Sequence, residues 1–517
     1  MTHDRFRVLA FAAVGGALTA LAFPPWAMPW LAPIGIAGLV VAVNGRSAIA
    51  GGMAGGAFGL VFFGTTLWWV SESIAVAAWG ALMLTQAAWV VMAGTAMTLV
   101  RPLRGWPAWT ALVWTSVETV RSLVPWGGMP WGRLGYTAVD APWEGSLAIG
   151  GVSAASALIV LIGALVAGVA SAVSERRPVL RLTRPVIAAG SALGVGMWLM
   201  MTASSLGGRL GVEERGVARV GVVQGGVPGD GTQVAANHRR VTQNQLTQTR
   251  RMLADRSSSA PVPDFVLWPE NATAVDPVRD SQARAAVSAA VTEAGAPVLL
   301  GAIVDTSSPA TALNEAIVWT ASGPESRYTK QHLVPFGEYV PLRPLAQLVS
   351  SRVADIGRDM VPGGAAQPLT VGDLRVAAAL CFDVAYDDVV RSQVALGADL
   401  VTVQTSNAMF LGTAQLEQQW IITRARAVEV GRSVVVASIN GISGAVGPDG
   451  RVIERLSPRV SASSLVEVPT ATGTSLAVQL GPWPSRAAGM LAIVAVAAAV
   501  RQRQRVSVGT QRPARLA

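Results

Sequence analysis

Long apolar runs fill the first part of the chain and are almost absent from its middle. From residue 8 to about residue 207 these runs carry almost no charge, whereas charged residues and short strand and helix patterns return between about 212 and 470. A helix needs roughly 20 apolar residues to cross a bilayer. The sequence therefore predicts a membrane region, followed by a globular domain large enough to have its own core.

Eight apolar segments are candidates for membrane spans. The first two, the one after Trp106 and the last are short for full spans. The last reaches spanning length only if Pro482–Arg486 is included, with the Arg486 charge at the interface. The predicted spans are Val8–Ala22, Met28–Val43, Ile49–Trp69, Ile74–Val100, Trp106–Val117, Leu147–Val173, Val186–Met201 and Ala487–Val500.

Arginines recur in the loops between these segments, and positive loops are retained on the cytoplasmic side of a membrane. If the spans alternate, the arginine-bearing loops all fall on one side. Both termini are then cytoplasmic, and the globular domain lies on the outer face. We expect transmembrane helices over residues 1–210, the globular domain over 211–470, and a helix with a basic tail over 471–517.

The net charge of +9 comes mostly from arginines, many of them in these loops. No nucleic-acid-binding motif accompanies the charge, so we expect no nucleic-acid partner. The three histidines, His3, His238 and His332, show no metal-ligand spacing. We therefore expect neither a metal site nor a cofactor.

The globular region alternates strand and helix patterns, which is typical of an α/β sandwich. The turn Pro448-Asp449-Gly450 predicts a hairpin. The predicted strands are Val217–Gln224, Phe265–Trp268, Val298–Val304, Glu315–Thr320, Val376–Leu380, Leu400–Val403 and Ser433–Ser438, and the predicted helices are Ser281–Ala294 and Ala414–Val430.

Cys381 is the only cysteine in the chain. It directly follows the apolar run Val376–Leu380, so a buried strand is predicted to lead into the thiol. A single cysteine cannot form an internal disulfide or a thiolate metal cluster. Because a lone cysteine is more often a small buried hydrophobe, its neighbours decide whether it acts as a nucleophile.

Two charged residues upstream suit a reactive thiol. Glu270 ends an apolar strand in FVLWPEN, a position suited to a general base. Lys330, in RYTKQHLVPFGEYVP, precedes a loop flanked by prolines, where a cation would lower the thiol pKa and stabilise an oxyanion. Considered singly, each is more often a solvated charge. The interpretation depends on their combination with Cys381.

The order WPEN, then YTKQHLVPFGEYVP, then a strand ending in cysteine resembles the nitrilase superfamily, whose members use Glu, Lys and Cys in that order. More closely, the PFGEYVP loop and the layout of the spans resemble the apolipoprotein N-acyltransferase family, its integral-membrane branch. The segments VVQGGVPGD, MPWGRLGY and ARAVEVGRSVVVASINGISGAVGPDGRV are also similar to family segments. The resemblance thus covers nearly the whole chain.

The resemblance implies a nitrilase-like α-β-β-α sandwich with Glu270 as general base, Lys330 as stabiliser of the thiolate and oxyanion, and Cys381 as nucleophile. Glu338 matches the family's additional glutamate. The implied reaction moves an acyl chain from a membrane phospholipid, through a Cys381 thioester, to the α-amine of the diacylglyceryl-cysteine that begins a lipoprotein. The implied partners are the phospholipid, the diacylated apolipoprotein and the bilayer of a bacterial cell membrane.

Two segments depart from the family pattern. The usual Cys-Tyr-Glu is here Cys381-Phe382-Asp383, and we expect Phe382 and Asp383 to support the site. The usual Asn-Asp-x-Trp-Phe-Gly is here Ser406–Leu411. This second departure weakens the transfer of substrate-binding roles to that loop.

Three loops are candidates for lipid contacts. The tryptophans of the outer loop Pro125–Trp143 fit interfacial anchoring or an entrance for a headgroup or acyl chain. The loops Pro335–Pro341 and Met409–Thr413 fit lids or simple turns. The residues expected to contact substrate are Trp131, Arg133, Tyr339, Met409 and Phe410.

Two other functions use the same features. A membrane-tethered amidase of the nitrilase type would use the same three residues on a small carbon–nitrogen substrate, although one span would suffice to tether it. A non-catalytic scaffold or a transporter is the other alternative. The near absence of ionisable residues inside the predicted spans argues against transport.

Overall fold

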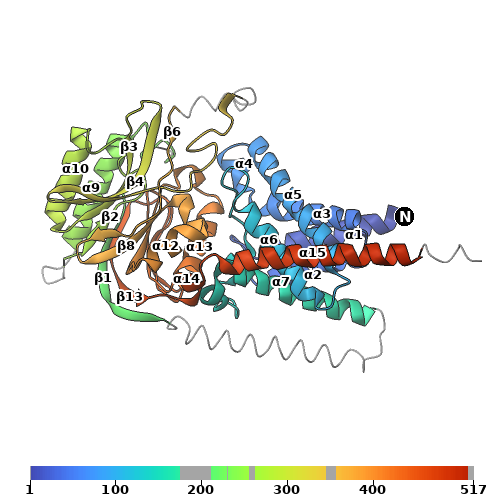
Figure 1. The fold of residues 1–517 in the computed structure, drawn as a ribbon. Helices are drawn as coiled ribbons and strands as arrows, with labels where there is room; N and C mark the ends of the chain where they lie inside the picture. Colours follow the sequence, from blue (N-terminus) through green and yellow to red (C-terminus); the bar gives the residue numbers. More distant parts are fainter. Residues whose placement is uncertain (1, 175–210, 230, 256–261, 345–356, 511–517) are drawn as a thin grey trace, which may run out of the picture. The chain divides into compact units, whose positions relative to one another are not determined.

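The computed structural model describes residues 2–174, 211–229, 231–255, 262–344 and 357–510, and it divides into two units (Figure 1). The first unit comprises Met1–Val124, Gly128–Ala203 and Pro482–Ala517. The second comprises Pro125–Gly127 and Ser204–Gly481. The described part of the first unit is helical, and the second contains two β-sheets with helices.

Apolar sequence forms most of the helices of the first unit. The longest, α7, is interrupted by non-helical backbone at Gly150 and Gly151. The elements are α1 (Thr2–Leu21), α2 (Leu31–Val43), α3 (Ala48–Thr66), α4 (Trp69–Ser73), α5 (Val76–Val100), α6 (Trp106–Arg121), η1 (Leu134–Ala138), α7 (Ser146–Ser174) and α15 (Trp483–Thr510).

Among the described residues, four helices are long and apolar enough to cross a membrane. Helices α2 and α6 are too short, with 13 and 16 residues, and the 20-residue α1 carries the charged residues Asp4, Arg5 and Arg7 near its start. The predicted span Val186–Met201 lies outside the described residues. The helices support a multi-span membrane unit, but the predicted number of eight spans is not confirmed. The four segments are Ala48–Thr66, Val76–Val100, Ser146–Val173 and Trp483–Arg505.

Helices α3 and α5 pack closely because glycines line their contact. A Cβ added to Gly55 would lie 2.2 Å from the carbonyl oxygen of Val90, and one added to Gly94 would lie 2.4 Å from that of Gly51. Small residues that let helix backbones approach are typical of packing within lipid, where apolar burial contributes little to helix association. This contact agrees with a membrane location of the first unit.

The second unit alternates strands and helices along most of its length. Its elements are β1 (Val212–Gln224), α9 (His238–Asp255), β2 (Phe265–Leu267), α10 (Ser281–Ala294), β3 (Val298–Asp305), β4 (Thr311–Thr320), β5 (Gly323–Thr329), β6 (Asp359–Met360), β7 (Leu369–Val371), β8 (Leu374–Leu380), η3 (Cys381–Ala385), α12 (Asp387–Ala395), β9 (Leu400–Thr405), η4 (Ala408–Phe410), α13 (Gln415–Val430), β10 (Val434–Ser438), β11 (Ser443–Val446), β12 (Val452–Leu456), β13 (Ala462–Gly473) and α14 (Leu476–Leu480).

Two stacked sheets and two pairs of helices form an α-β-β-α sandwich (Figure 1). The first sheet has the strand order β13-β1-β2-β3-β4-β5, with β6 beside β4, and the second has the order β12-β11-β10-β9-β8-β7. Helices α9 and α10 pack on the first sheet, and α12 and α13 pack on the second. The predicted sandwich is thus present.

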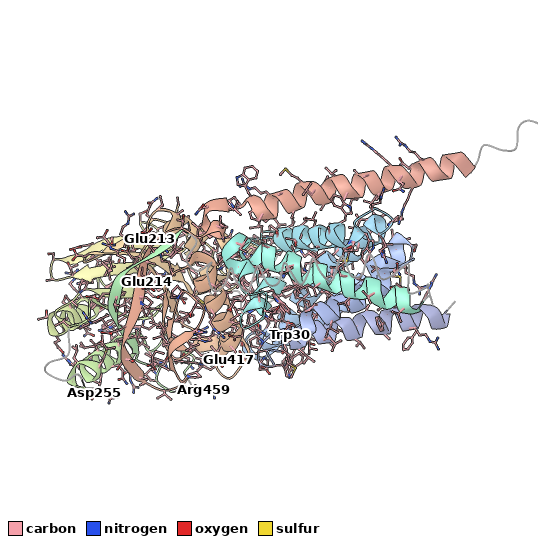
Figure 2. All side chains as sticks on the ribbon, turned by 90° about the horizontal axis from the view of Figure 1, so that it is seen from below. Trp30, Glu213, Glu214, Asp255, Glu417 and Arg459 are labelled. Carbon is pink, nitrogen blue, oxygen red and sulfur yellow. The ribbon has the colours of Figure 1, made fainter. Side chains whose placement is uncertain are left out.

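Each predicted strand and both predicted helices are present in the second unit. The Pro448–Gly450 turn joins β11 and β12, which pair antiparallel as predicted. Strand β13 was not predicted, and it pairs antiparallel with β1 from the other end of the unit. Figure 2 marks Glu213 and Glu214 near the exposed start of β1, opposite Thr472 and Ala471.

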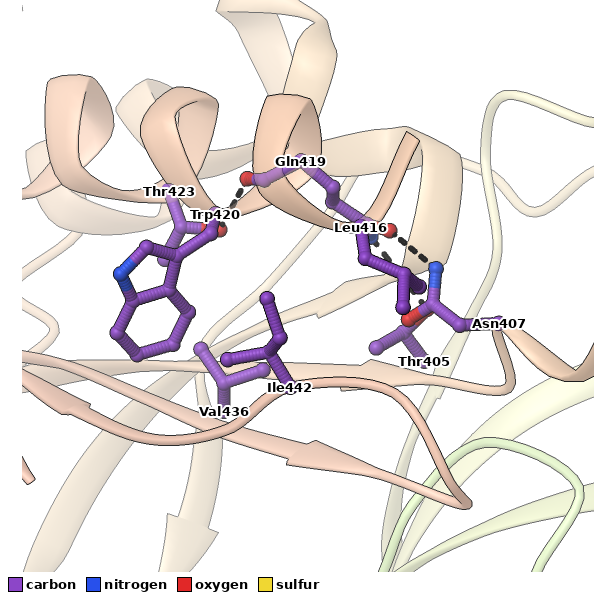
Figure 3. Close-up of a pocket in the computed structure, with 8 residues that line it drawn as sticks. All are labelled: Thr405, Asn407, Leu416, Gln419, Trp420, Thr423, Val436 and Ile442. Atoms are coloured by element: carbon purple, nitrogen blue, oxygen red, sulfur yellow. Dashed lines mark hydrogen bonds between the residues drawn. The ribbon is translucent and has the colours of Figure 1, made fainter. Parts of the chain in front are cut away.

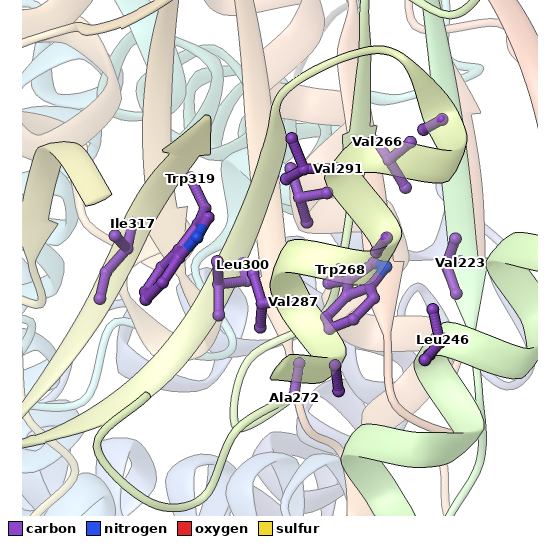
Figure 4. Packing of buried hydrophobic residues seen from close by; sticks show 14 of the residues in the cluster. Val223, Leu246, Val266, Trp268, Ala272, Val287, Val291, Leu300, Ile317 and Trp319 are labelled. Atoms are coloured by element: carbon purple, nitrogen blue, oxygen red, sulfur yellow. The ribbon is translucent and has the colours of Figure 1, made fainter. Parts of the chain in front are cut away.

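An apolar core between the first sheet and its two helices holds the segment that leads to Glu270 (Figure 4). Alternate residues of β3, such as Leu300, join Val287 of α10 in this core, as expected for a strand with one face toward helices. Trp268 is fully buried, and its indole nitrogen donates to the Thr249 hydroxyl at 3.0 Å. The backbone just before Glu270 is therefore firmly anchored.

Candidate active site

The carboxyl ends of parallel strands from both sheets bring the predicted residues together. Cys381 directly follows β8, whose Leu380 pairs with Gln404 on the parallel strand β9. Glu270 follows β2 of the other sheet. The Gln404 side chain joins the two sheets there, because its Nε2 donates to the Trp268 carbonyl oxygen at 2.7 Å. The thiol and the carboxylate thus come from different sheets that are directly connected.

Three of the predicted charges form one cluster, in which Glu270 and Lys330 are buried and Glu338 is partly buried. The Lys330 Nζ lies 3.1 Å from Glu270 Oε1 and 3.0 Å from Glu338 Oε1. Asn314 of β4 donates from Nδ2 to the same two oxygens, at 2.8 and 2.9 Å. Lys330 is only 1% exposed and Glu270 only 3%. The cluster holds two carboxylates around one ammonium group, with Asn314 as a fourth member.

Backbone donors fix the second oxygen of each carboxylate. The Ser406 N–H donates to Glu270 Oε2 at 2.9 Å, and the Val334 N–H donates to Glu338 Oε2 at 2.9 Å. Strand β3 also packs tightly against the Glu270 backbone, since a Cβ added to Gly301 would lie 2.5 Å from the Glu270 Cα. Neither carboxylate can turn without breaking hydrogen bonds, which is the preorganisation that catalysis requires.

Lys330 remains charged despite its burial. Burial lowers the pKa of Lys330, but the carboxylates of Glu270 and Glu338 raise it well above its usual value. An ammonium group with a raised pKa is a poor proton donor. Lys330 is therefore suited to stabilise negative charge on a reacting group rather than to transfer a proton.

Cys381 adopts a backbone conformation that is unusual for its residue type. Its φ is +49°, in the left-handed region, which costs a non-glycine residue about 1–3 kcal/mol. It begins the short η3 turn, directly after the last residue of β8. Such strain is often retained at nucleophiles, because the turn presents the side chain away from the strand.

The Cys381 thiol is protonated at neutral pH. Burial raises its pKa from the usual 9.0 to about 12, and the negative charge of Glu270 adds to the increase. Lys330 lowers the thiol pKa, as predicted, and so does a hydrogen bond with Thr405, but neither offsets the burial. The thiolate must therefore form as a base accepts the proton, and Glu270 is the carboxylate with the strongest effect on the thiol.

This pKa predicts slow alkylation of the resting protein. A pKa near 12 instead of 9.0 lowers the thiolate fraction at pH 8 about 10³-fold. We expect iodoacetamide to label Cys381 about 10³-fold more slowly than a free cysteine peptide, with the rate rising about tenfold per pH unit up to pH 11. Intact-mass spectrometry measures the rate, and Cys381→Ser should remain unlabelled. Labelling at pH 8 as fast as in the peptide would contradict this pKa.

Phe382 and Asp383 directly follow Cys381 in the η3 turn, and both contact neighbouring segments. The fully buried Asp383 carboxylate accepts hydrogen bonds from the Tyr328 hydroxyl at 2.7 Å and from the backbone N–H of His332 at 2.8 Å. Burial raises the pKa of Asp383 to about 6. The Phe382 ring packs edge-on against Tyr386, with 5.3 Å between centroids. Asp383 thus ties the cysteine turn to the segment that contains Lys330.

The residues expected to contact substrate fall into two groups. In the second unit, Met409 is 57% exposed, and the Tyr339 hydroxyl donates to the Trp126 carbonyl oxygen at 3.2 Å. In the first unit, Trp131 and Arg133 are each only 2% exposed. The guanidinium of Arg133 donates to a serine hydroxyl of α7 at 2.9 Å. The structure brings neither residue of the first unit to the protein surface, and the predicted contacts with lipid stay predictions.

Sequence motifs did not reveal three uncharged members of the site, Asn314, Thr405 and Gln419. Asn314 alone left a detectable signal, because it interrupts an apolar face of β4 that includes Ala312 and Ala316. In the parts of the chain that the structure describes, no group of three or more His, Cys, Asp and Glu residues would hold a metal ion.

Comparison with known proteins identifies both parts of the chain. Residues 15–165 match the family model for the apolipoprotein N-acyltransferase N-terminal domain, and residues 248–477 match the carbon-nitrogen hydrolase model. The apolipoprotein N-acyltransferase of Mycolicibacterium smegmatis is 32% identical over 474 residues, which cover 87% of this chain and 78% of that protein. The chain belongs to the apolipoprotein N-acyltransferase family.

A second relative agrees with this family. The apolipoprotein N-acyltransferase of Gloeobacter violaceus is 28% identical over 496 residues, 91% of this chain and 89% of that protein. A solved carbon-nitrogen hydrolase from Helicobacter pylori has 14% identity and a TM-score of 0.38, covering 52% of this chain and 94% of its own. The carbon-nitrogen hydrolase match confirms the nitrilase-like class predicted for the second unit.

Proposed function

We propose that this chain transfers an acyl chain from a membrane phospholipid to the α-amine of the diacylglyceryl-cysteine at the N-terminus of lipoproteins. Membership of the apolipoprotein N-acyltransferase family supports the reaction class. The observation that carries the chemistry is the Glu270–Lys330–Glu338 cluster beside the one thiol of the chain.

The first half of the reaction forms a thioester. The Cys381 sulfur attacks the ester carbonyl carbon of the phospholipid while Glu270 accepts the thiol proton. Negative charge develops on the carbonyl oxygen, where Lys330 and the backbone N–H of Phe382 stabilise it. The carbon–oxygen ester bond then breaks, and Glu270 returns the proton to the oxygen of the departing lysophospholipid. The enzyme retains the acyl chain on sulfur.

The second half transfers the acyl chain to nitrogen. The neutral α-amine of the diacylated acceptor attacks the thioester carbon, and Glu270 accepts one amine proton. The same two donors stabilise the oxyanion. The carbon–sulfur bond then breaks, an amide is released, and Glu270 protonates the departing sulfur. Glu338 holds the ammonium group of Lys330 in place through both half-reactions, because its Oε1 lies 3.0 Å from the Lys330 Nζ.

The membrane unit fits substrates that are both lipids. We place the catalytic domain, residues 211–470, on the outer face of a bacterial cell membrane, with the helices of residues 1–210 and 471–517 spanning it and both termini in the cytoplasm. Eight spans would give this orientation, since arginine-rich loops stay on the cytoplasmic side. A site at the interface concentrates lipid substrates and limits competition by water. Tyr339, Met409 and Phe410 are the proposed lipid contacts, whereas Trp131 and Arg133 are buried and would contact lipid only if the loop that contains them opens.

Acyl transfer in proteoliposomes tests this function. Purified protein is incubated with a phospholipid bearing a labelled acyl chain, and then with a diacylated lipopeptide. We expect an acyl mass increment on Cys381 that moves to the lipopeptide amine, and no increment on either in Cys381→Ser. A peptide of the same sequence without lipid is the matched acceptor control. Release of free fatty acid with no transfer to the lipopeptide would favour a hydrolase and refute the proposal.

A further inference from the structure

Gln419, which no sequence motif revealed, contacts the backbone of Cys381. Its Nε2 donates to the Cys381 carbonyl oxygen at 3.3 Å and to the Thr405 hydroxyl at 3.4 Å. Gln419 is 4% exposed, and Figure 3 shows its side chain extending from α13 toward Thr405 and Asn407. A helix on the outside of the second sheet therefore reaches the turn that carries the thiol.

A buried amide network fixes the orientation of the Gln419 side chain. Its Oε1 accepts from Asn407 Nδ2 at 2.6 Å and from Gln415 Nε2 at 3.1 Å. Asn407 is oriented in turn, because its Oδ1 accepts from the hydroxyls of Thr405 at 2.8 Å and Ser438 at 3.2 Å. Each amide therefore has donors facing its oxygen. Gln419 must present its NH₂ group to Cys381, since the flipped amide would place donor against donor.

The Cys381 carbonyl and the Phe382 N–H belong to one peptide group. A trans peptide is planar, so its C=O and N–H point in opposite directions. Fixing the Cys381 carbonyl toward Gln419 therefore directs the Phe382 N–H away from α13. The Cys381 backbone follows the end of β8 and has a left-handed φ of +49°. A hydrogen bond to the carbonyl helps hold this conformation.

We propose that Gln419 is a positioning residue that sets the plane of the Cys381–Phe382 peptide, so that the Phe382 N–H faces the oxyanion of the acyl-transfer reaction. This role rests on the proposed function, which requires that donor. Without Gln419 the peptide can rotate and relieve the strain at Cys381, and the N–H is then lost to the oxyanion. Removing one oxyanion donor typically slows a reaction about 10²- to 10³-fold.

Two substitutions separate this role from simple filling of space. Gln419→Met keeps the length of the side chain but removes the NH₂ donor, together with the oxygen that accepts from Asn407 and Gln415. Gln419→Glu keeps the shape and places an acceptor against the Cys381 carbonyl. Thr423→Val is the matched control, because Thr423 lines the same small pocket (Figure 3) and its hydroxyl donates to the Gln419 backbone carbonyl.

Comparing acylation with alkylation provides the decisive measurement. Acylation of Cys381 by phospholipid passes through an oxyanion, whereas alkylation by iodoacetamide does not. In full-length protein in proteoliposomes, we expect Gln419→Met to slow single-turnover acylation about 10²- to 10³-fold. Its alkylation rate and its half-saturating phospholipid concentration should stay near those of the wild type, and its melting temperature should fall by only a few degrees, because the buried Asn407 and Gln415 amides lose one acceptor. Gln419→Glu should acylate as slowly, and Thr423→Val should acylate normally.

Three outcomes would overturn the inference. Normal acylation by Gln419→Met, in a preparation whose wild type also acylates, would show that the donor is not needed and would leave the proposed function intact. Equal loss of acylation and alkylation, or a large fall in melting temperature, would indicate a general packing role. A wild-type protein that forms no acyl-enzyme would contradict the proposed function and this inference together.

Discussion

Replacing Lys330 with methionine is expected to slow acyl-enzyme formation about 10³-fold, because the change removes an oxyanion stabiliser. It also removes a cation that contacts both Glu270 and Glu338. These carboxylates would then share the Asn314 amide with no positive charge between them. The thiol pKa should rise further, since Lys330 lowers it. Intact-mass spectrometry of Cys381 with a labelled phospholipid measures the rate.

A double variant separates lost chemistry from lost stability. Lys330→Met alone leaves the buried Glu270 and the partly buried Glu338 without their counter-charge, which should lower the melting temperature. Lys330→Met combined with Glu338→Gln removes one of those charges and should recover much of the stability while activity stays low. Acylation by Lys330→Met within tenfold of the wild type would contradict the role given to Lys330. Recovery of activity in the double variant would show that Lys330 acts only by balancing the negative charges of Glu270 and Glu338.

Replacing Arg426 with methionine should have the largest effect on stability. Arg426 is fully buried in α13 and forms an ion pair with the fully buried Glu429. Its guanidinium also donates to the carbonyl oxygens of Val384 and Ala385, at 2.8 and 2.9 Å. Glu429 keeps a second cation, Arg391, but the buried Val384 and Ala385 carbonyl oxygens each lose a donor, and each buried group left without its hydrogen bond costs about 1–3 kcal/mol. We expect the melting temperature to fall by roughly 10 °C.

Arg424→Met is the matched control for this change. Arg424 lies on the same helix, is partly exposed, and donates from Nε to the Gly450 carbonyl oxygen at 2.7 Å. Its loss should lower the melting temperature by only a few degrees. Because Val384 and Ala385 belong to the turn that begins at Cys381, Arg426→Met should also slow acylation. Equal melting temperatures for the two variants would show that the buried ion pair contributes little.

The sequence was sufficient to find the three charged residues and the thiol that the structure brings together. A lone cysteine after an apolar run, an acid at a strand end and a lysine before a proline-flanked loop are each visible locally. Elements of both sheets bring these residues together, and the order of the three motifs along the chain predicted that they would meet. Glu270, Lys330 and Glu338 are indeed in contact, and Cys381 interacts electrostatically with all three.

The parts that sequence reasoning missed depend on tertiary register. Asn314 and Gln419 are uncharged, and nothing in a strand or helix pattern says which residue of another element they will meet. The raised pKa of the Cys381 thiol was also not predicted, because burial raises this pKa more than Lys330 lowers it. The prediction of eight spans is not confirmed, because α2 and α6 are shorter than a full span and the predicted span Val186–Met201 lies outside the described residues.

The pairing of β1 with β13 has a consequence for how the enzyme is made. Strand β1 is the first of the second unit to leave the ribosome, and β13 is the last. Until residues 462–473 are synthesised, the edge of β1 that β13 will cover has no strand beside it, and an open edge can pair with other chains. The nascent chain already contains Glu270, Lys330 and Cys381 by then, yet its first sheet is complete only shortly before helix α15 emerges.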